Sequence, residues 1–219
     1  MNADLLSTLL SSANCDSYSI IVKYLNGIYD VLTPTIRRSL YNTLYAFLNG
    51  RFTSTGNACM INGETNKDWI SNSFGRFSVY APYNDLVKIQ NDFNGMDLLS
   101  DLSSDQLAGL LLSGSVLSSD SNINSIALVL QGMSFSQLDT FLSSLQSIAA
   151  TNNIVSIPNG KSVLLDAVYG TIAKQFSIFT NEQYKDYFGS KLGLLIGGIT
   201  ASQINLIPNS INCQTLQNM

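Results

Sequence analysis

Ser103-Ser-Asp-Gln-Leu107 is the stretch that decides the fold, because its pattern returns three more times in the chain. In each copy a hydroxyl residue is followed, after two positions, by Gln and then by an apolar residue. This is the capping box: the hydroxyl accepts from the N–H three residues on, and the Gln side chain reaches back to the N–H of the cap. The pattern therefore predicts four helix starts. The other copies are Ser134-Phe-Ser-Gln-Leu138, Thr180-Asn-Glu-Gln-Tyr184 and Thr200-Ala-Ser-Gln-Ile204.

The capping boxes lie 31, 46 and 20 residues apart, which is too irregular for a solenoid of equal repeats. They indicate a degenerate stack of short helices with well-defined starts. With the helical spacing of apolar residues elsewhere, they predict an all-α fold of about ten or more short capped helices. We expect the arrangement to be armadillo-like or a novel superhelix.

Helical spacing also dominates the first part of the chain. Over residues 17–32 the apolar side chains share one helical face. Thr33 then caps a second helix, with Pro34 at its first position, where the missing N–H costs nothing. Asn49-Gly50 is a typical helix stop and is expected to end this helix. The two apolar stripes are Ile21, Tyr24, Leu25, Ile28 and Leu32, and then Ile36, Leu40, Leu44, Phe47 and Leu48.

Residues 49–66 predict a long loop, since they contain three glycines and no periodicity. Asn66 is expected to cap a short helix that carries Trp69. A further helix is expected to begin at Pro82.

The three cysteines, Cys15, Cys59 and Cys213, fit no zinc pattern. We predict a disulfide between Cys15 and Cys59, which would tie the predicted loop to the first long helix and contribute about 3–4 kcal/mol. Cys213 is then left over, and the sequence leaves open whether it is free or paired. The alternative is that all three are small buried apolar residues.

Gly95 separates a part richer in aromatic residues from the part with the capping boxes. We therefore expect two subdomains. Residues 1–94 form a helical subdomain with a disulfide-tied loop, and residues 95–219 form a subdomain of short capped helices. Because glycine gives the backbone freedom, Asn94-Gly95 is the candidate hinge between them.

Charge is scarce in this chain: 12% of the residues are charged, against roughly 25% in a typical soluble protein. Ser, Asn, Thr and Gln must supply most of the polar surface. The net charge is −4, and no basic residue occurs between Lys88 and Lys161. Nucleic-acid binding needs clustered Lys and Arg, so we exclude it.

No catalytic apparatus is evident. The chain has no His, the commonest general base and zinc ligand. Asp97, Asp101 and Asp105 are predicted to be solvated residues near a helix start rather than a calcium site. Asn159-Gly-Lys-Ser162 lacks the upstream glycine of a phosphate loop and predicts a turn into a helix. We expect no enzyme activity, no cofactor and no metal.

The chain is expected to be secreted and extracellular, because a disulfide is stable there. Met1 to Leu10 lacks the basic start and the long apolar run of a signal peptide, so a mature chain is expected. The most apolar segment, residues 192–211, is interrupted by polar residues and proline, which argues against a membrane span.

The chain resembles two groups of known proteins, one in particular stretches of sequence and the other in size and composition. Asp68-Trp69 to Ala81, the run around Gln106 and the terminal Ser210-Ile-Asn-Cys213 resemble the repeat unit of secreted mesothelin-like proteins of fish and amphibians. That resemblance implies an extracellular helical array without known catalysis. In size, acidity and its Ser/Asn/Leu-rich helical make-up the chain also resembles the ranaspumins, surfactant proteins of frog foam nests. That resemblance implies a protein that lowers surface tension and stabilises foam.

The expected function is adsorption at the air–water interface through the apolar faces of amphipathic helices, with other foam proteins or glycans as further partners. Exposing ~1,000 Å² of apolar surface to air would recover ~25 kcal/mol, more than the ~5–15 kcal/mol that hold a domain together. The chain is therefore expected to open at Asn94-Gly95. The alternative is an adhesion or interaction module. A lipid carrier ranks third. Aromatic residues expected to supply contacts in such a module are Tyr41, Tyr45, Tyr83 and Tyr187.

Overall fold

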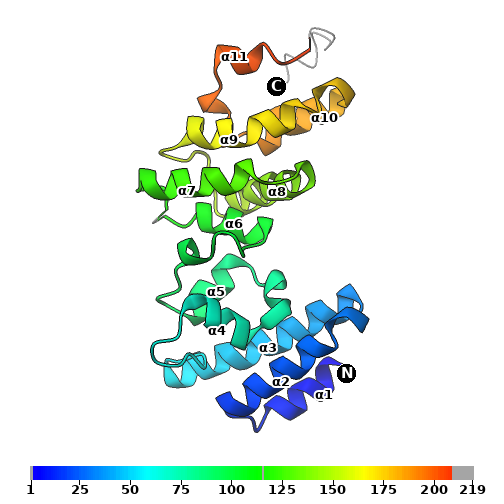
Figure 1. Ribbon diagram of the computed structural model, residues 1–219, viewed down its shortest axis with the longest axis vertical. Helices are drawn as coiled ribbons and strands as arrows, with labels where there is room; N and C mark the ends of the chain where they lie inside the picture. The colour runs from blue at the N-terminus through cyan, green and yellow to red at the C-terminus, as the bar shows by residue number, and fades with distance from the viewer. Residues whose placement is uncertain (1, 115, 209–219) are drawn as a thin grey trace. The chain divides into compact units, whose positions relative to one another are not determined.

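The computed structural model describes residues 2–114 and 116–208, and every regular element in these residues is helical (Figure 1). The predicted all-α fold of many short capped helices is confirmed. The chain forms two compact units, unit 1 up to Asp101 and unit 2 from Leu102.

Unit 1 is built around one long helix. α3 packs against α1, α5 and the 3₁₀ helix η2, while α2 packs against α4 and η2. The buried side chains of α3 are Leu40, Tyr41, Leu44 and Leu48. The elements of unit 1 are α1 (Ala3–Leu10), α2 (Cys15–Gly27), η1 (Tyr29–Val31), α3 (Pro34–Thr55), α4 (Asn66–Ser73), η2 (Gly75–Tyr80), α5 (Tyr83–Ile89) and η3 (Gly95–Leu98).

Unit 2 is a stack of shorter helices. α6 packs against α8, α7 against α9, and α9 against the 3₁₀ helix η6. α10 continues directly into η5, a π-helical turn. The elements of unit 2 are α6 (Ser104–Leu111), α7 (Asp120–Gln131), α8 (Phe135–Thr151), α9 (Lys161–Ala173), η4 (Phe176–Ile178), α10 (Asn181–Asp186), η5 (Tyr187–Lys191), η6 (Ile196–Gly198) and α11 (Ala201–Ile204).

All four predicted capping boxes are present, and all four lie in unit 2. At the start of α8, the Gln137 N–H donates to Ser134 Oγ at 3.3 Å and the Ser134 N–H donates to Gln137 Oε1 at 2.9 Å. The apolar residue that follows the Gln is buried in three copies. In the fourth, Ile204 is 51% exposed and Gln203 itself is buried.

The end of α3 and the start of α4 differ from the predictions. α3 does not stop at Asn49-Gly50 but runs to Thr55, because a single glycine costs a helix only about 1 kcal/mol and does not by itself end it. It ends at Gly56, whose φ of 72° is the left-handed conformation of a helix C-cap. The cap of α4 is Thr65 rather than Asn66, which is the first helical residue.

The helix predicted over residues 17–32 is shorter and turned about its axis relative to the prediction. α2 begins at Cys15, capped by Asn14, and ends at Gly27. Its buried residues are Tyr18, Val22 and Leu25, whereas Tyr24 of the predicted stripe is 61% exposed. The spacing of the apolar residues is compatible with burial of either face of α2. The buried face is the one that packs on α4 and η2.

The division between the units falls after Asp101, seven residues beyond the boundary expected at Asn94-Gly95. Asn94 and Gly95 lie inside unit 1: Gly95 is buried in η3, and η3 packs against α4. Lys67 of α4 and Asp101 form an ion pair at 2.7 Å. This ion pair joins the segment after η3 to α4, within unit 1. The opening of the chain at Asn94-Gly95 stays a prediction.

Candidate functional site

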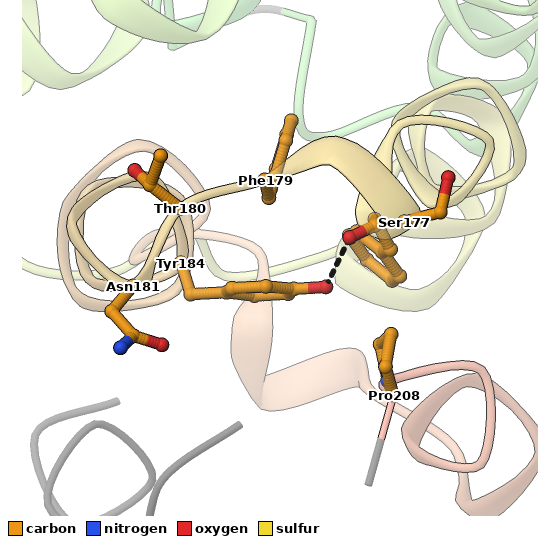
Figure 2. Close-up of a pocket in the computed structure, with 7 residues that line it drawn as sticks. Ser177, Phe179, Thr180, Asn181, Tyr184 and Pro208 are labelled. Atoms are coloured by element: carbon orange, nitrogen blue, oxygen red, sulfur yellow. Dashed lines mark hydrogen bonds between the residues drawn. The ribbon is translucent and has the colours of Figure 1, made fainter. Parts of the chain in front are cut away.

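A cleft of about 630 Å³ lies beside η4 and α10 in unit 2 (Figure 2). Its size is typical of small-molecule sites, which range over roughly 300–1,000 Å³. In Figure 2 the Asn181 side chain and Pro208 lie on one side of the Tyr184 ring and Phe179 on the other. The lining residues are Phe176, Ser177, Phe179, Thr180, Asn181, Tyr184 and Pro208.

The capping box of α10 explains how the sequence forms this cleft. Thr180 caps the helix, which places Tyr184 one turn later, facing back toward η4. The Tyr184 hydroxyl donates to the Phe176 carbonyl oxygen at 2.7 Å and so fixes η4 against α10. Burial raises the pKa of Tyr184, so this hydroxyl stays protonated at neutral pH and remains a donor.

The cleft is neutral, since none of its lining residues carries a charge. Ser177, Thr180 and Asn181 offer hydroxyl and amide groups beside aromatic rings. These groups can bind a neutral polar ligand, but they include no general acid or base that titrates near neutrality. The lining residues thus suit a neutral polar ligand.

Unit 1 contains a related arrangement that the sequence analysis missed. Thr65-Asn66 caps α4 and is followed three residues later by Trp69, just as Thr180-Asn181 is followed by Tyr184. The Trp69 Nε1–H donates to the Ala58 carbonyl oxygen at 3.1 Å, an aromatic donor to a preceding backbone oxygen as in unit 2. The shared signal Thr-Asn-x-x-aromatic could have revealed this internal echo.

The two arrangements differ in the charge of the clefts that their helix starts border. Trp69 is fully buried, with the Phe93 ring at 5.9 Å and the Phe74 ring at 6.2 Å, and Tyr184 is only 3% exposed. In unit 1 Thr65 and Asn66 line a cleft of about 540 Å³ together with charged residues such as Lys67 and Asp92. The equivalent helix starts thus border a charged cleft in unit 1 and a neutral cleft in unit 2.

A second candidate feature is an apolar surface on α1 and α2. Leu6 and Leu10 of α1 are buried, yet Leu5 and Leu9 on the neighbouring face are 51% and 45% exposed. On α2 the exposed pair is Ile20 and Tyr24, at 69% and 61%. Since i and i+4 residues lie on one side of a helix, each pair forms a short apolar stripe. We call these four residues the α1–α2 apolar pairs.

The predicted Cys15–Cys59 disulfide is present, with the two Cα atoms 5.3 Å apart. It joins the first residue of α2 to the segment before α4. Beside it lies a groove of about 270 Å³ that is also lined by Ile20, Ile61 and Glu64. Cys213 lies outside the described residues, so its pairing stays open.

The tyrosines expected to supply surface contacts do not do so. Tyr41, Tyr83 and Tyr187 are at most 5% exposed and belong to the cores, and Tyr45 is half-buried beside the Tyr41 ring. Their helical spacing is that of core residues, and packing on neighbouring helices accounts for them.

The acidic residues and the Asn159-Gly160 motif make structural contacts and turns in the fold. Asp97 accepts from Asn66 and Asn94, and Asp101 pairs with Lys67. Within the described part of the chain no cluster of three metal-ligating side chains occurs. Asn159-Gly160 forms the predicted turn into α9, with Gly160 at a φ of 77°.

Comparison with models of protein families, with curated proteins and with solved structures finds no match to this chain. Among the described residues, no helix is both long and apolar enough to cross a membrane.

Proposed function

We propose that this chain is an extracellular protein that adsorbs at the air–water interface through the α1–α2 apolar pairs. The observation that supports the proposal is that both helices are apolar on two faces. One face of each helix packs into the core. The exposed face can therefore move from water to the air–water interface while the chain stays folded.

Removal of these side chains from water favours adsorption. Full burial of a large apolar side chain is favourable by about 1.5–3 kcal/mol, and each of the four is about half exposed. Removing them from water is therefore worth on the order of 1 kcal/mol each, or about 4 kcal/mol together.

The surroundings of the pairs favour the same function. The charged residues of α1 and α2 are Asp4, Asp16 and Lys23, and the other polar residues are neutral Ser, Thr and Asn. Neutral groups cost less to bring to an apolar boundary than charges do. A low net charge also limits repulsion between neighbouring molecules in a film.

Surface tension of dilute solutions tests the proposal. A variant with Leu5, Leu9, Ile20 and Tyr24 all replaced by Gln should adsorb more weakly and lower the surface tension less than the unaltered chain. The matched control replaces four exposed apolar residues of unit 2 by Gln, namely Leu128, Val155, Ile178 and Ile204.

Circular dichroism before and after heating establishes that each variant is folded. The proposal fails if the two folded variants lower the surface tension equally, or if the unaltered chain is no more surface-active than an ordinary acidic protein.

The second candidate is an interaction module of the mesothelin-like type, which the neutral cleft beside α10 favours. Binding of the fluorescently labelled chain to immobilised neutral glycans is the measurement. Asn181→Asp should abolish binding, because it places a charge where a neutral ligand must lie. Glu182→Gln, at the exposed next position, is the control and should bind normally. Equal binding by the Asn181→Asp variant would exclude the cleft as the site.

A further inference from the structure

Five Asn-Gly pairs occur in this chain, at Asn26, Asn49, Asn62, Asn94 and Asn159. Asn-Gly is the dipeptide in which the backbone nitrogen of the glycine most readily attacks the side-chain amide, because glycine has no side chain to obstruct it. The reaction needs a free glycine N–H and an Asn side chain free to turn toward it.

Four of the pairs are restrained. The N–H groups of Gly27 and Gly50 lie inside α2 and α3, where the helix ladder holds them. The Asn94 side chain accepts from the Met96 N–H and donates to Asp97, and Gly95 is buried. The Asn159 side chain donates to the Leu117 carbonyl oxygen at 3.1 Å. Gly160 lies so close to the Ile123 side chain that an added Cβ would be 2.7 Å from it.

Asn62-Gly63 differs on each of these points. It occupies the centre of a turn in which the Glu64 N–H donates to the Ile61 carbonyl oxygen at 3.0 Å. Gly63 has a φ of 81°, as the third residue of a type II turn requires. Both residues are exposed, and neither the Asn62 side chain nor the Gly63 N–H bonds to any described residue.

The ends of the turn are held by other contacts. Glu64 accepts from the Ile61 N–H at 3.0 Å and from the Asn72 side chain at 2.6 Å. The ends of the turn are therefore held in place, while the Asn62 amide has no hydrogen bond to a described residue that would stop it rotating.

We propose that Asn62 is a site of spontaneous, self-catalysed deamidation. The Gly63 nitrogen attacks Asn62 Cγ, the carboxamide C–N bond breaks, and the Gly63 proton leaves with the amide nitrogen as ammonia. Water then opens the succinimide at either carbonyl, giving aspartate or isoaspartate. No cofactor takes part, and the rate rises with pH because the attacking nitrogen must lose its proton.

The modification would change a defined surface. It adds a carboxylate next to Glu64 and takes the net charge from −4 to one unit more negative. Ile61 and Glu64 line the groove beside the Cys15–Cys59 disulfide, so the new charge would lie at the edge of that groove. The inference does not depend on the proposed interfacial function.

Peptide mass mapping after incubation of the native chain at mildly alkaline pH tests the proposal, with isoaspartyl methyltransferase labelling as a second readout. Asn62 should convert at least about fivefold faster than the Asn of each of the other four Asn-Gly pairs. Each of those pairs must first lose an interaction worth ~1 kcal/mol. In the reduced chain in denaturant, the five rates should converge.

Two variants complete the test. Asn62→Gln should remove the early conversion and leave the slow ones unchanged, whereas Asn159→Gln should not affect the early conversion. Equal native rates at all five pairs would overturn the proposal, as would earlier conversion at Asn26 or Asn49.

Discussion

Unit 1 and unit 2 stabilise similar short helices by different means. Unit 1 has the Cys15–Cys59 disulfide together with single side-chain caps such as Asn14, Thr33 and Thr65. Unit 2 has all four complete capping boxes. The difference teaches that a fold of short helices can be stabilised either by single caps with one cross-link or by reciprocal capping boxes.

The two units also differ in the surroundings of their ion pairs. In unit 1 Arg76 binds Asp30 through both terminal guanidinium nitrogens, and both side chains are well exposed. In unit 2 Lys191 is mostly buried, at 2.7 Å from Asp139 and 3.0 Å from Asp186, and Tyr187 donates to Asp139. The contact in unit 2 is therefore less screened by solvent.

Removing the disulfide should give the largest effect and confine it to unit 1. The bridge closes a loop with a sequence separation of 44, so replacing Cys15 and Cys59 by Ser should lower the free energy of unfolding by about 4 kcal/mol. Native-state hydrogen exchange resolves the units. Protection should fall in α2 and α4 and stay unchanged in α7 and α9; an equal loss in both units would break the comparison.

Gly198→Ala should give the next largest effect, in unit 2. A Cβ at Gly198 would lie 2.6 Å from the Ser162 backbone nitrogen, so η6 would have to move away from α9. Overpacking of this kind costs about 1–3 kcal/mol. Gly197→Ala is the matched control, since its Cβ would meet only the flexible Lys161 side chain at 3.7 Å. Thermal unfolding measures both, and similar losses would contradict the close approach.

Loss of one capping box should cost less. Ser134→Ala removes the acceptor for the Gln137 N–H and should destabilise unit 2 by about 1 kcal/mol. Ser136→Ala, two residues later on an exposed position, should be neutral or slightly stabilising because alanine is the best helix former. Urea unfolding of both variants is the measurement. Equal free energies of unfolding for the two variants would show that the capping box at Ser134 does not stabilise unit 2.

Acid pH should give the smallest effect. Partial burial raises the pKa of Asp139, but hydrogen bonds from Lys191 and Tyr187 and the charge of Lys191 outweigh it, so the pKa lies below its ordinary value. A depressed carboxyl pKa contributes stability above the unfolded pKa of ~3.9, and this is lost as pH falls through the folded pKa.

Asp139→Asn should therefore flatten the acid side of the stability profile of unit 2. The hydrogen bonds from Arg76 also hold the pKa of Asp30 below its ordinary value. Because Asp30 is exposed, Asp30→Asn should flatten the profile of unit 1 less. Urea unfolding between pH 3 and 6, roughly spanning the ordinary carboxyl pKa, compares the two. A larger change in unit 1 would reverse the expected order.

Much of the fold was predictable where local chemistry decides it. The four capping boxes, the Thr33-Pro34 start and the Cys15–Cys59 pair all appear as the sequence predicts. Capping depends on residues three positions apart, so the sequence contains every partner of the interaction. The neutral cleft was not predictable, because it depends on how η4 meets α10 across the Tyr184 hydrogen bond.

By itself the sequence determined the helical class, the helix starts of unit 2, the scarcity of charge and the disulfide. Only the tertiary structure decided which face of α2 is buried, where α3 ends and which aromatic residues reach the surface. It also decided that the helix start at Thr65 borders a charged cleft while the one at Thr180 borders a neutral cleft. The physical reason is that burial depends on contacts between residues far apart in the chain, which local propensities do not determine.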